Sequence, residues 1–175
     1  FELAVQDVAV SRRDRAASWP VAAMMIDIDH FKRVNDEHGH ERGDQVLVEL
    51  AGRLRDNLRA TDIPYRVGGE EFVLLLPGRD IEAAAQVAER IRRAVEDTPL
   101  AGLAVTISAG AVSAGATQST LAEMLRQADA TLYAAKRGGR NRVQRPAEVH
   151  DTMQALRAAQ AQHPSAEGLV PDPSS

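Results

Sequence analysis

The feature that most constrains this chain is a Gly-Gly-Glu-Glu-Phe motif at residues 68–72, where two glycines are followed at once by two carboxylates. An apolar run continues from the motif to residue 76. A second segment, residues 62–65, lies before the motif. Because glycine takes the positive φ angles of a tight turn without steric cost, this pattern predicts a β-hairpin. Neighbouring strand residues point to opposite faces, so we expect one of Glu70 and Glu71 to face a cleft. Taken alone, the motif is also typical of a solvated hairpin tip.

The composition is that of a globular domain with a small acidic excess. A chain of 175 residues with 44% apolar content suits one domain rather than two. Its net charge of -4 argues against a protein that coats nucleic-acid polymers and leaves small phosphates as ligands. The absence of cysteine excludes disulfides, thiolate zinc sites and a cysteine nucleophile, and it fits a reducing compartment. Without a signal peptide or a membrane-length apolar run, the sequence predicts a cytoplasmic domain, which a longer protein could attach to a membrane.

The first expected strand ends in two carboxylates. Residues 21–26 form a short, continuously apolar run, which is typical of a strand buried on both faces. Asp27 and Asp29 follow this run, and ligands of open α/β sheets usually bind at such a strand end. We expect Asp29 to cap the next helix and Asp27 to be the functional carboxylate.

Four helices are expected after this strand. The polar residues 30–38 predict a short helix that stops at Gly39, and we assign no metal to the two histidines that flank this glycine. A long helix with an inward leucine stripe is expected from residue 43 to residue 59. Asp80 is expected to cap another helix, and Thr120 with Glu123 forms a capping box that opens the last one.

The order of the expected elements predicts the fold class. Residues 103–112 read as a strand in which Gly110 marks a bulge or a close approach, and residues 142–144 read as an edge strand. Strand, helices, hairpin, helix, strand and helix together predict an α+β fold, a mostly antiparallel five-stranded sheet flanked by helices. This ferredoxin-like arrangement is similar to the palm of nucleotide cyclases and polymerases. We expect a helical lead-in at residues 1–19, the main domain at residues 20–145, and a marginal helix with a disordered tail at residues 146–175.

The chain resembles the GGDEF family of diguanylate cyclases, with residues 68–72 as the GGEEF variant of the name motif. Further matching motifs lie at residues 27–32, 35–40, 43–44, 128–133, 135–136 and 139–141. The family's Asp-x-Leu-Thr-Gly-Leu-x-Asn-Arg-Arg segment is replaced by residues 7–13, where only the arginine pair matches. This difference concerns the N-terminal helix and the geometry of a dimer, and it leaves the expected metal and base contacts in place.

The resemblance implies that two GTP molecules are condensed into cyclic di-GMP with release of pyrophosphate. Attack of a 3′-hydroxyl on an α-phosphate needs a divalent cation, here Mg²⁺ with Mn²⁺ as an alternative. The implied metal and catalytic residues are Asp27, Ile28, Glu70 and Glu71, and carboxylate oxygens are the ligands that Mg²⁺ prefers. Glu70 is also placed by the resemblance to assist deprotonation of the hydroxyl.

The resemblance also assigns the contacts with GTP. Phosphate contacts are implied for Phe31, Lys32, Lys136 and Arg140, and guanine contacts for Asn35 and Asp44. Each assignment has a purely structural alternative. Lys136 and Arg140 would also complement a helix C-terminus. Asn35 would also serve a turn, and Asp44 would also cap a helix.

An Arg-x-x-Asp spacing at residues 59–62, with five residues between it and Gly68, matches the family's inhibitory product site. Arg59 can donate two hydrogen bonds to guanine, Asp62 can accept from its N1 or N2, and Arg90 is a further contact. An arginine that ends a helix and an aspartate that opens a turn are equally ordinary in a structural role.

The implied partners follow from the chemistry. One domain holds one GTP, so catalysis requires a homodimer, and a chain that opens on Phe1 is interpreted as part of a longer protein with an upstream sensory or receiver domain. One alternative is a non-catalytic domain of the same fold that binds GTP or cyclic di-GMP. A polymerase-like palm is a more distant alternative, which the acidic balance and the 3% aromatic content disfavour.

Overall fold

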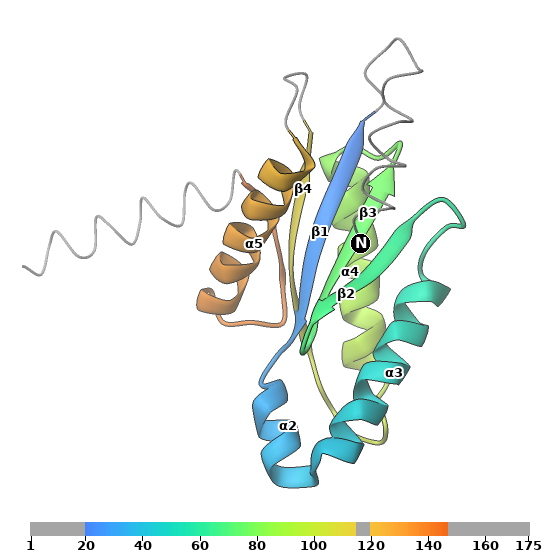
Figure 1. The fold of residues 1–175 in the computed structure, drawn as a ribbon, viewed down its shortest axis with the longest axis vertical. Coiled ribbons are helices and arrows are strands. Elements are labelled where there is room, and N and C mark those ends of the chain that lie inside the picture. The colour runs from blue at the N-terminus through green and yellow to red at the C-terminus, as the bar shows by residue number, and fades with distance from the viewer. Residues whose placement is uncertain (1–19, 115–119, 147–175) are drawn as a thin grey trace, which may run out of the picture.

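The computed structural model describes residues 20–114 and 120–146, so the expected N-terminal lead-in, the arginine pair before residue 14 and the C-terminal tail lie outside the described residues. The elements in chain order are β1 (Val21–Ile28), α2 (Phe31–His38), α3 (His40–Asp56), β2 (Ile63–Gly68), β3 (Glu71–Pro77), α4 (Ile81–Asp97), β4 (Ile107–Ser113), α5 (Leu121–Arg137) and β5 (Val143–Gln144). The five strands form one sheet in the order β2-β3-β1-β4-β5, and only β4 and β5 pair in parallel (Figure 1). The expected α+β fold is confirmed.

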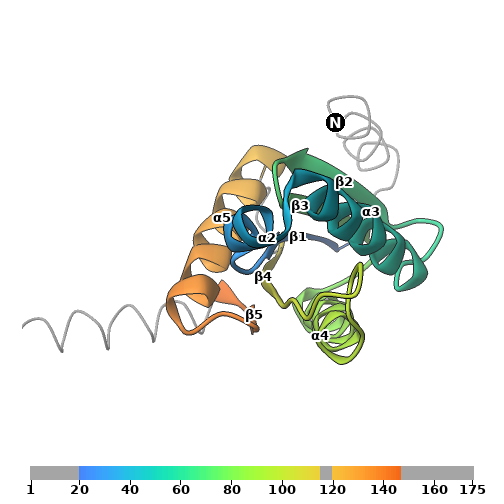
Figure 2. The ribbon, with the colours of Figure 1, turned by 90° about the horizontal axis from the view of Figure 1, so that it is seen from below.

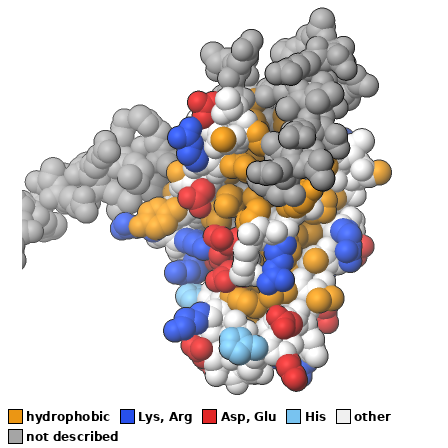
Figure 3. Space-filling model, in the orientation of Figure 1, with side chains coloured by type: hydrophobic (Ala, Val, Ile, Leu, Met, Phe, Trp, Pro, Cys, Tyr) orange, Lys and Arg blue, Asp and Glu red, His pale blue; other side chains and the backbone are white. Residues whose placement is uncertain are grey.

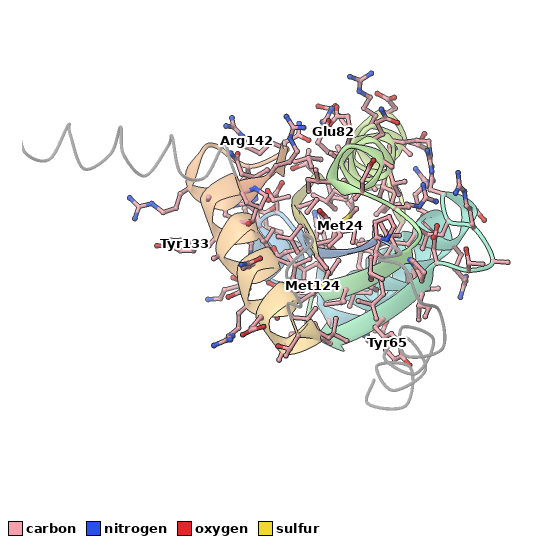
Figure 4. The ribbon with its side chains drawn as sticks, turned by 90° about the horizontal axis from the view of Figure 1, so that it is seen from above. Met24, Tyr65, Glu82, Met124, Tyr133 and Arg142 are labelled. Atoms are coloured by element: carbon pink, nitrogen blue, oxygen red, sulfur yellow. The ribbon has the colours of Figure 1, made fainter. Side chains whose placement is uncertain are left out.

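Helices cover both faces of the sheet. Figure 2 shows α3 and α4 on one side of the strands and α5 on the other. In β1, Met24 and Ile26 pack with α3 and α4, whereas Val21 and Ala23 pack with α5 residues such as Met124 (Figure 4). Burial on both faces explains why a continuous apolar run encodes this strand.

Local chemistry fixes the ends of the helices. The Asp80 side chain accepts a hydrogen bond from the Ala83 amide at 2.8 Å, and Thr120 and Glu123 form a capping box, so both expected caps are confirmed. The expected start of α3 is wrong, because the helix begins at His40 rather than at Gly43. Gly43 is instead a packing residue inside the helix.

Two further boundaries differ from the expectation. Helix α3 ends at Asp56 rather than at residue 59. Strand β4 begins at Ile107 rather than at residue 103, because Leu100 and Leu103 exchange backbone hydrogen bonds of 3.0 and 2.8 Å across a tight turn. The turn takes positive φ angles at Ala101 and Gly102, which an extended strand does not allow.

Gly110 of β4 permits a close approach of helix α5. A Cβ atom built on Gly110 would lie 2.3 Å from the Leu132 nitrogen and 2.4 Å from the Ala128 carbonyl oxygen. The expectation of a close approach is therefore confirmed. Because α5 carries Lys136, this contact also sets how near that side chain comes to β1.

Candidate functional site

The β2–β3 hairpin has a braced turn. Gly69 takes a φ of +30°, and the pairing register shifts between Arg66 and Gly68. The Arg66 guanidinium donates hydrogen bonds of 3.0 and 2.7 Å to the Gly69 carbonyl oxygen. The hairpin expected from the two glycines is confirmed. The sequence pattern did not single out Arg66, whose hydrogen bonds hold Gly69, the residue just before Glu70.

Three acidic residues and one lysine meet at this edge of the sheet. Asp27 lies opposite Glu71 in the β1–β3 register, so both side chains leave the sheet on the same face. The Lys136 ammonium lies 2.7 Å from Asp27 Oδ2, while Asp27 itself is 4% exposed. Burial raises the pKa of Asp27, Lys136 opposes that rise, and the charges of Glu70 and Glu71 add to it. Figure 3 shows acidic and basic side chains side by side on this face of the molecule.

The carboxylates fit a metal only together with other oxygen donors. Among residues 20–114 and 120–146, no group of three or more acidic, histidine or cysteine side chains is arranged to hold a metal ion. The available donors are the Asp27 and Glu70 carboxylates, Glu71 and the backbone carbonyl of Ile28 at the end of β1. Mg²⁺ usually binds one or two carboxylates and completes its octahedron with waters and substrate phosphates. The donor set therefore fits Mg²⁺ in the presence of a phosphate ligand.

Helix α2 offers free amides close to this edge. Its N-cap, His30, is left-handed with φ 57° and makes no side-chain cap. In the described part of the chain, the amides of Phe31 and Lys32 donate no hydrogen bond, and the first amide that does is that of Arg33, to His30 at 2.8 Å. The Lys32 side chain is 88% exposed, at 3.9 Å from Asp36. Such a helix start suits an anion.

Asp29 does not cap α2, so that expectation is wrong. Its amide donates to the Thr106 carbonyl oxygen at 2.9 Å, which continues the sheet one residue beyond β1. Its carboxylate is buried and accepts from Thr106 Oγ1 at 2.7 Å, Ser108 Oγ at 2.7 Å and the Asn141 amide at 3.0 Å. Asp29 thus joins the end of β1 to β4 and to the loop after α5.

The two residues expected to bind guanine lie on neighbouring helices. A Cβ atom on Gly43 would lie 1.9 Å from Asn35 Oδ1, so the Asn35 side chain occupies the space that the glycine leaves. Asp44 follows on α3, is exposed, and makes no hydrogen bond or ion pair with other described residues. The alternative that Asp44 caps α3 is wrong, because the helix begins at His40.

A cavity of about 470 Å³ lies between α3 and β2, beside Asp44. Its lining is mainly apolar and includes three charged residues. The lining residues are Asp44, Leu47, Val48, Ala51, Leu54, Arg55, Pro64, Tyr65, Arg66 and Phe72. A mainly apolar cavity with a few polar groups is typical of a small-molecule site.

The Arg-x-x-Asp residues have contrasting environments. Arg59 is exposed, and Arg90 donates to Asn57 Oδ1 at 3.1 Å and to the Asn57 carbonyl oxygen at 2.6 Å, which places it beside the same loop. The Asp62 side chain is fully buried, and its Oδ2 accepts from Arg79 Nη2 at 2.8 Å and from the Arg59 amide at 2.9 Å. The two arginines therefore face solvent, while the carboxylate faces inward.

The comparisons with known sequences point in one direction. Residues 6–142 match the family model described as diguanylate cyclase, GGDEF domain. The chain is 45% identical over 130 residues to the response regulator PleD of Caulobacter vibrioides, which covers 71% of this chain and 29% of PleD. It is 43% identical over 143 residues to the diguanylate cyclase DgcP of Pseudomonas aeruginosa, which covers 79% of this chain and 21% of DgcP. The chain thus spans less than a third of the length of these two relatives.

Solved structures share the fold. The active GGEEF domain of a diguanylate cyclase from Vibrio cholerae superposes with a TM-score of 0.72 at 35% identity, covering 81% of this chain and 89% of that one. The GGDEF domain of DgcB from Caulobacter crescentus, solved in complex with c-di-GMP, gives a TM-score of 0.66 at 36% identity, covering 72% and 77%. Both agree with the five-stranded sheet and its helical layers. No helix in the described ranges is long and apolar enough to cross a membrane.

Proposed function

Because this chain belongs to the GGDEF family of diguanylate cyclases, we propose that it condenses two GTP molecules into cyclic di-GMP and releases pyrophosphate. The observation that carries the proposal is the meeting of Asp27, Glu70, Glu71 and Lys136 at one edge of the sheet. We assign the catalytic domain to residues 20–145, within a longer protein that acts in the cytoplasm.

Asp27 and Glu70 are assigned to hold Mg²⁺ or Mn²⁺, with Glu71 and the Ile28 carbonyl as further donors. The bound cation would neutralise phosphate charge and favour the ionised 3′-hydroxyl. Glu70, held by the braced turn, is also placed to accept the proton of that hydroxyl.

Groups from two parts of the chain, one positively charged and one with free backbone amides, are assigned to bind the triphosphate. Lys136 already places its ammonium beside Asp27, and Arg140 lies four residues further on, in the loop that follows α5. On the other side, the free amides of Phe31 and Lys32 supply neutral donors at a helix start. These groups would orient the α-phosphate for attack and balance the charge that develops on the leaving pyrophosphate.

Asn35 and Asp44 are assigned to the guanine base. Guanine presents N1-H and N2-H donors that a carboxylate accepts, whereas adenine has an unprotonated N1 and lacks the N2 amine. The exposed and unpaired Asp44 carboxylate beside the cavity between α3 and β2 supports this assignment. We therefore infer a substrate preference for GTP over ATP.

The reaction needs two copies of the domain. One domain binds one GTP, so two copies must face each other to bring each 3′-hydroxyl in line with the partner's α-phosphate. We infer a homodimer whose assembly is controlled by an upstream sensory or receiver domain. The match to a response regulator, of which this chain spans only a part, supports such an arrangement.

Product feedback is assigned to the surface around Arg59, Asp62 and Arg90. The two arginines are exposed on neighbouring segments and can donate to the O6 and N7 atoms of guanine or to phosphate oxygens. The complex of the related DgcB domain with c-di-GMP supports binding of the product by a domain of this fold. For Asp62 to contact product, its carboxylate would have to leave Arg79.

Incubation of the purified protein with GTP and Mg²⁺, followed by detection of cyclic di-GMP by mass spectrometry, tests the proposed function. The alternative function is a signalling module that binds GTP or cyclic di-GMP without cyclising. A binding module would bind a non-hydrolysable GTP analogue in calorimetry but would form no cyclic di-GMP from GTP. A cyclase would do both.

A further inference from the structure

The loop that carries Arg140 has an unusual backbone. Gly139, Arg140 and Asn141 take consecutive φ angles of +114°, +63° and +45°. Left-handed conformations are unfavourable for residues other than glycine, so two in succession persist only where surrounding contacts hold them. The Arg140 side chain makes no hydrogen bond or ion pair with the described residues, so its own guanidinium does not hold the loop.

Asn141 adds three contacts to the backbone hydrogen bonds of this loop, such as the 3.1 Å bond from the Arg140 amide to the Ala135 carbonyl oxygen. The backbone amide of Asn141 donates a hydrogen bond to the buried Asp29 carboxylate at 3.0 Å. Its side chain accepts from Arg92 Nη1 at 2.7 Å and donates to Glu96 Oε1 at 2.6 Å, which ties the loop to α4. The hydrogen bond from Asn141, followed by that from Arg92, lowers the pKa of Glu96.

The loop is therefore fastened to the end of β1 on both sides of Arg140. On the N-terminal side, Lys136 contacts Asp27 at 2.7 Å. On the C-terminal side, Asn141 contacts Asp29, two residues further along the same strand end. Arg140 lies in the chain between these two fixed points, and its guanidinium is exposed and available to a ligand.

We propose that Asp29 and Asn141 are positioning residues that hold the Arg140 guanidinium in place for the triphosphate of GTP. This inference rests on the proposed function. A carboxylate suits position 29 because three donors converge on its two oxygens, two hydroxyl groups and the loop amide. Loss of the carboxylate would leave the backbone amide of Asn141 without its acceptor and would remove one of the contacts that hold this unfavourable backbone.

The test is a double-mutant cycle between Asp29→Ala and Arg140→Ala, read out by calorimetry with a non-hydrolysable GTP analogue. Asp29→Ala is expected to weaken binding of the analogue by about ten- to a hundredfold, the range of a charge-assisted contact. Because Asp29 acts through Arg140, adding Asp29→Ala to Arg140→Ala should change affinity less than about threefold. Ser108→Ala is the matched control, since it removes another hydrogen bond of Asp29 and leaves the loop contact intact.

A second variant covers the case in which Asp29→Ala fails to fold. Asn141→Gly keeps the left-handed backbone at low cost but removes the side-chain bonds to Arg92 and Glu96. It should weaken binding of the analogue and speed hydrogen exchange of the loop amides. Additive losses in the cycle, or wild-type affinity in both Asp29→Ala and Asn141→Gly, would overturn the proposal. Intact binding of the analogue by the wild type without formation of cyclic di-GMP would overturn the proposed function alone.

Discussion

Removing Arg79 should destabilise the domain strongly, because it strips a buried carboxylate of its cation. Arg79 and Asp62 side chains are 7% and 0% exposed, and Nη2 lies 2.8 Å from Oδ2. In Arg79→Met, Asp62 Oδ2 keeps only the Arg59 amide, while Oδ1 already lacks a partner. Removal of one member of a buried pair costs about 3–5 kcal/mol, so we expect a loss of this size in the free energy of unfolding.

The double variant separates the buried charge from the packing. The ion pair itself is imperfect, since Asp62 Oδ1 and Arg79 Nε are both buried without a hydrogen-bond partner in the described structure. Replacing both residues, as in Asp62→Asn with Arg79→Met, should therefore restore most of the stability, with a coupling free energy of about 2 kcal/mol or more. Urea unfolding followed by circular dichroism measures all four proteins. A loss below about 1 kcal/mol in Arg79→Met, or strictly additive losses, would refute this reasoning.

Three other perturbations test separate parts of the site. Asp44→Ala should sharply reduce discrimination between GTP and ATP, which we expect to be about 10⁴-fold in the wild type, and comparable turnover of both nucleotides by the wild type would contradict the guanine site. Cyclic di-GMP should bind the wild type at about micromolar affinity or tighter, Arg59→Ala should abolish this binding in calorimetry, and unchanged affinity would remove the assignment. Gly110→Ala should cost about 1–3 kcal/mol and lower activity, because the new methyl group meets the α5 backbone at 2.3 Å; unchanged stability and activity would contradict the close packing.

Much of the fold could be predicted because its determinants are local. Strand β1 is a largely apolar run. Asp80 caps α4 by accepting a hydrogen bond from the amide of Ala83, only three residues away. The hairpin depends on Gly69 and its immediate neighbours. Patterns of this kind are complete within a few residues, so the sequence displays them directly.

The contacts of the buried carboxylates could not be predicted, because their partners are distant in the chain. Asp29 meets Thr106, Ser108 and Asn141 across 77, 79 and 112 residues. Its sequence position before a helix suggested a cap, but the sheet extends one residue further and turns the side chain toward β4. Asp62 likewise faces Arg79, an interaction across 17 residues that only the β2–β3 hairpin creates.

Asp27 and Glu70 are proposed to form the site at which GTP is cyclised. The most direct test compares wild type and Glu70→Gln in GTP and Mg²⁺, with the rate of cyclic di-GMP formation measured by mass spectrometry and folding checked by circular dichroism. The wild type should form cyclic di-GMP, and the Gln variant should be slower by about two orders of magnitude or more while it stays folded. No product from the wild type, or more than about a tenth of wild-type activity in Glu70→Gln, would contradict the account.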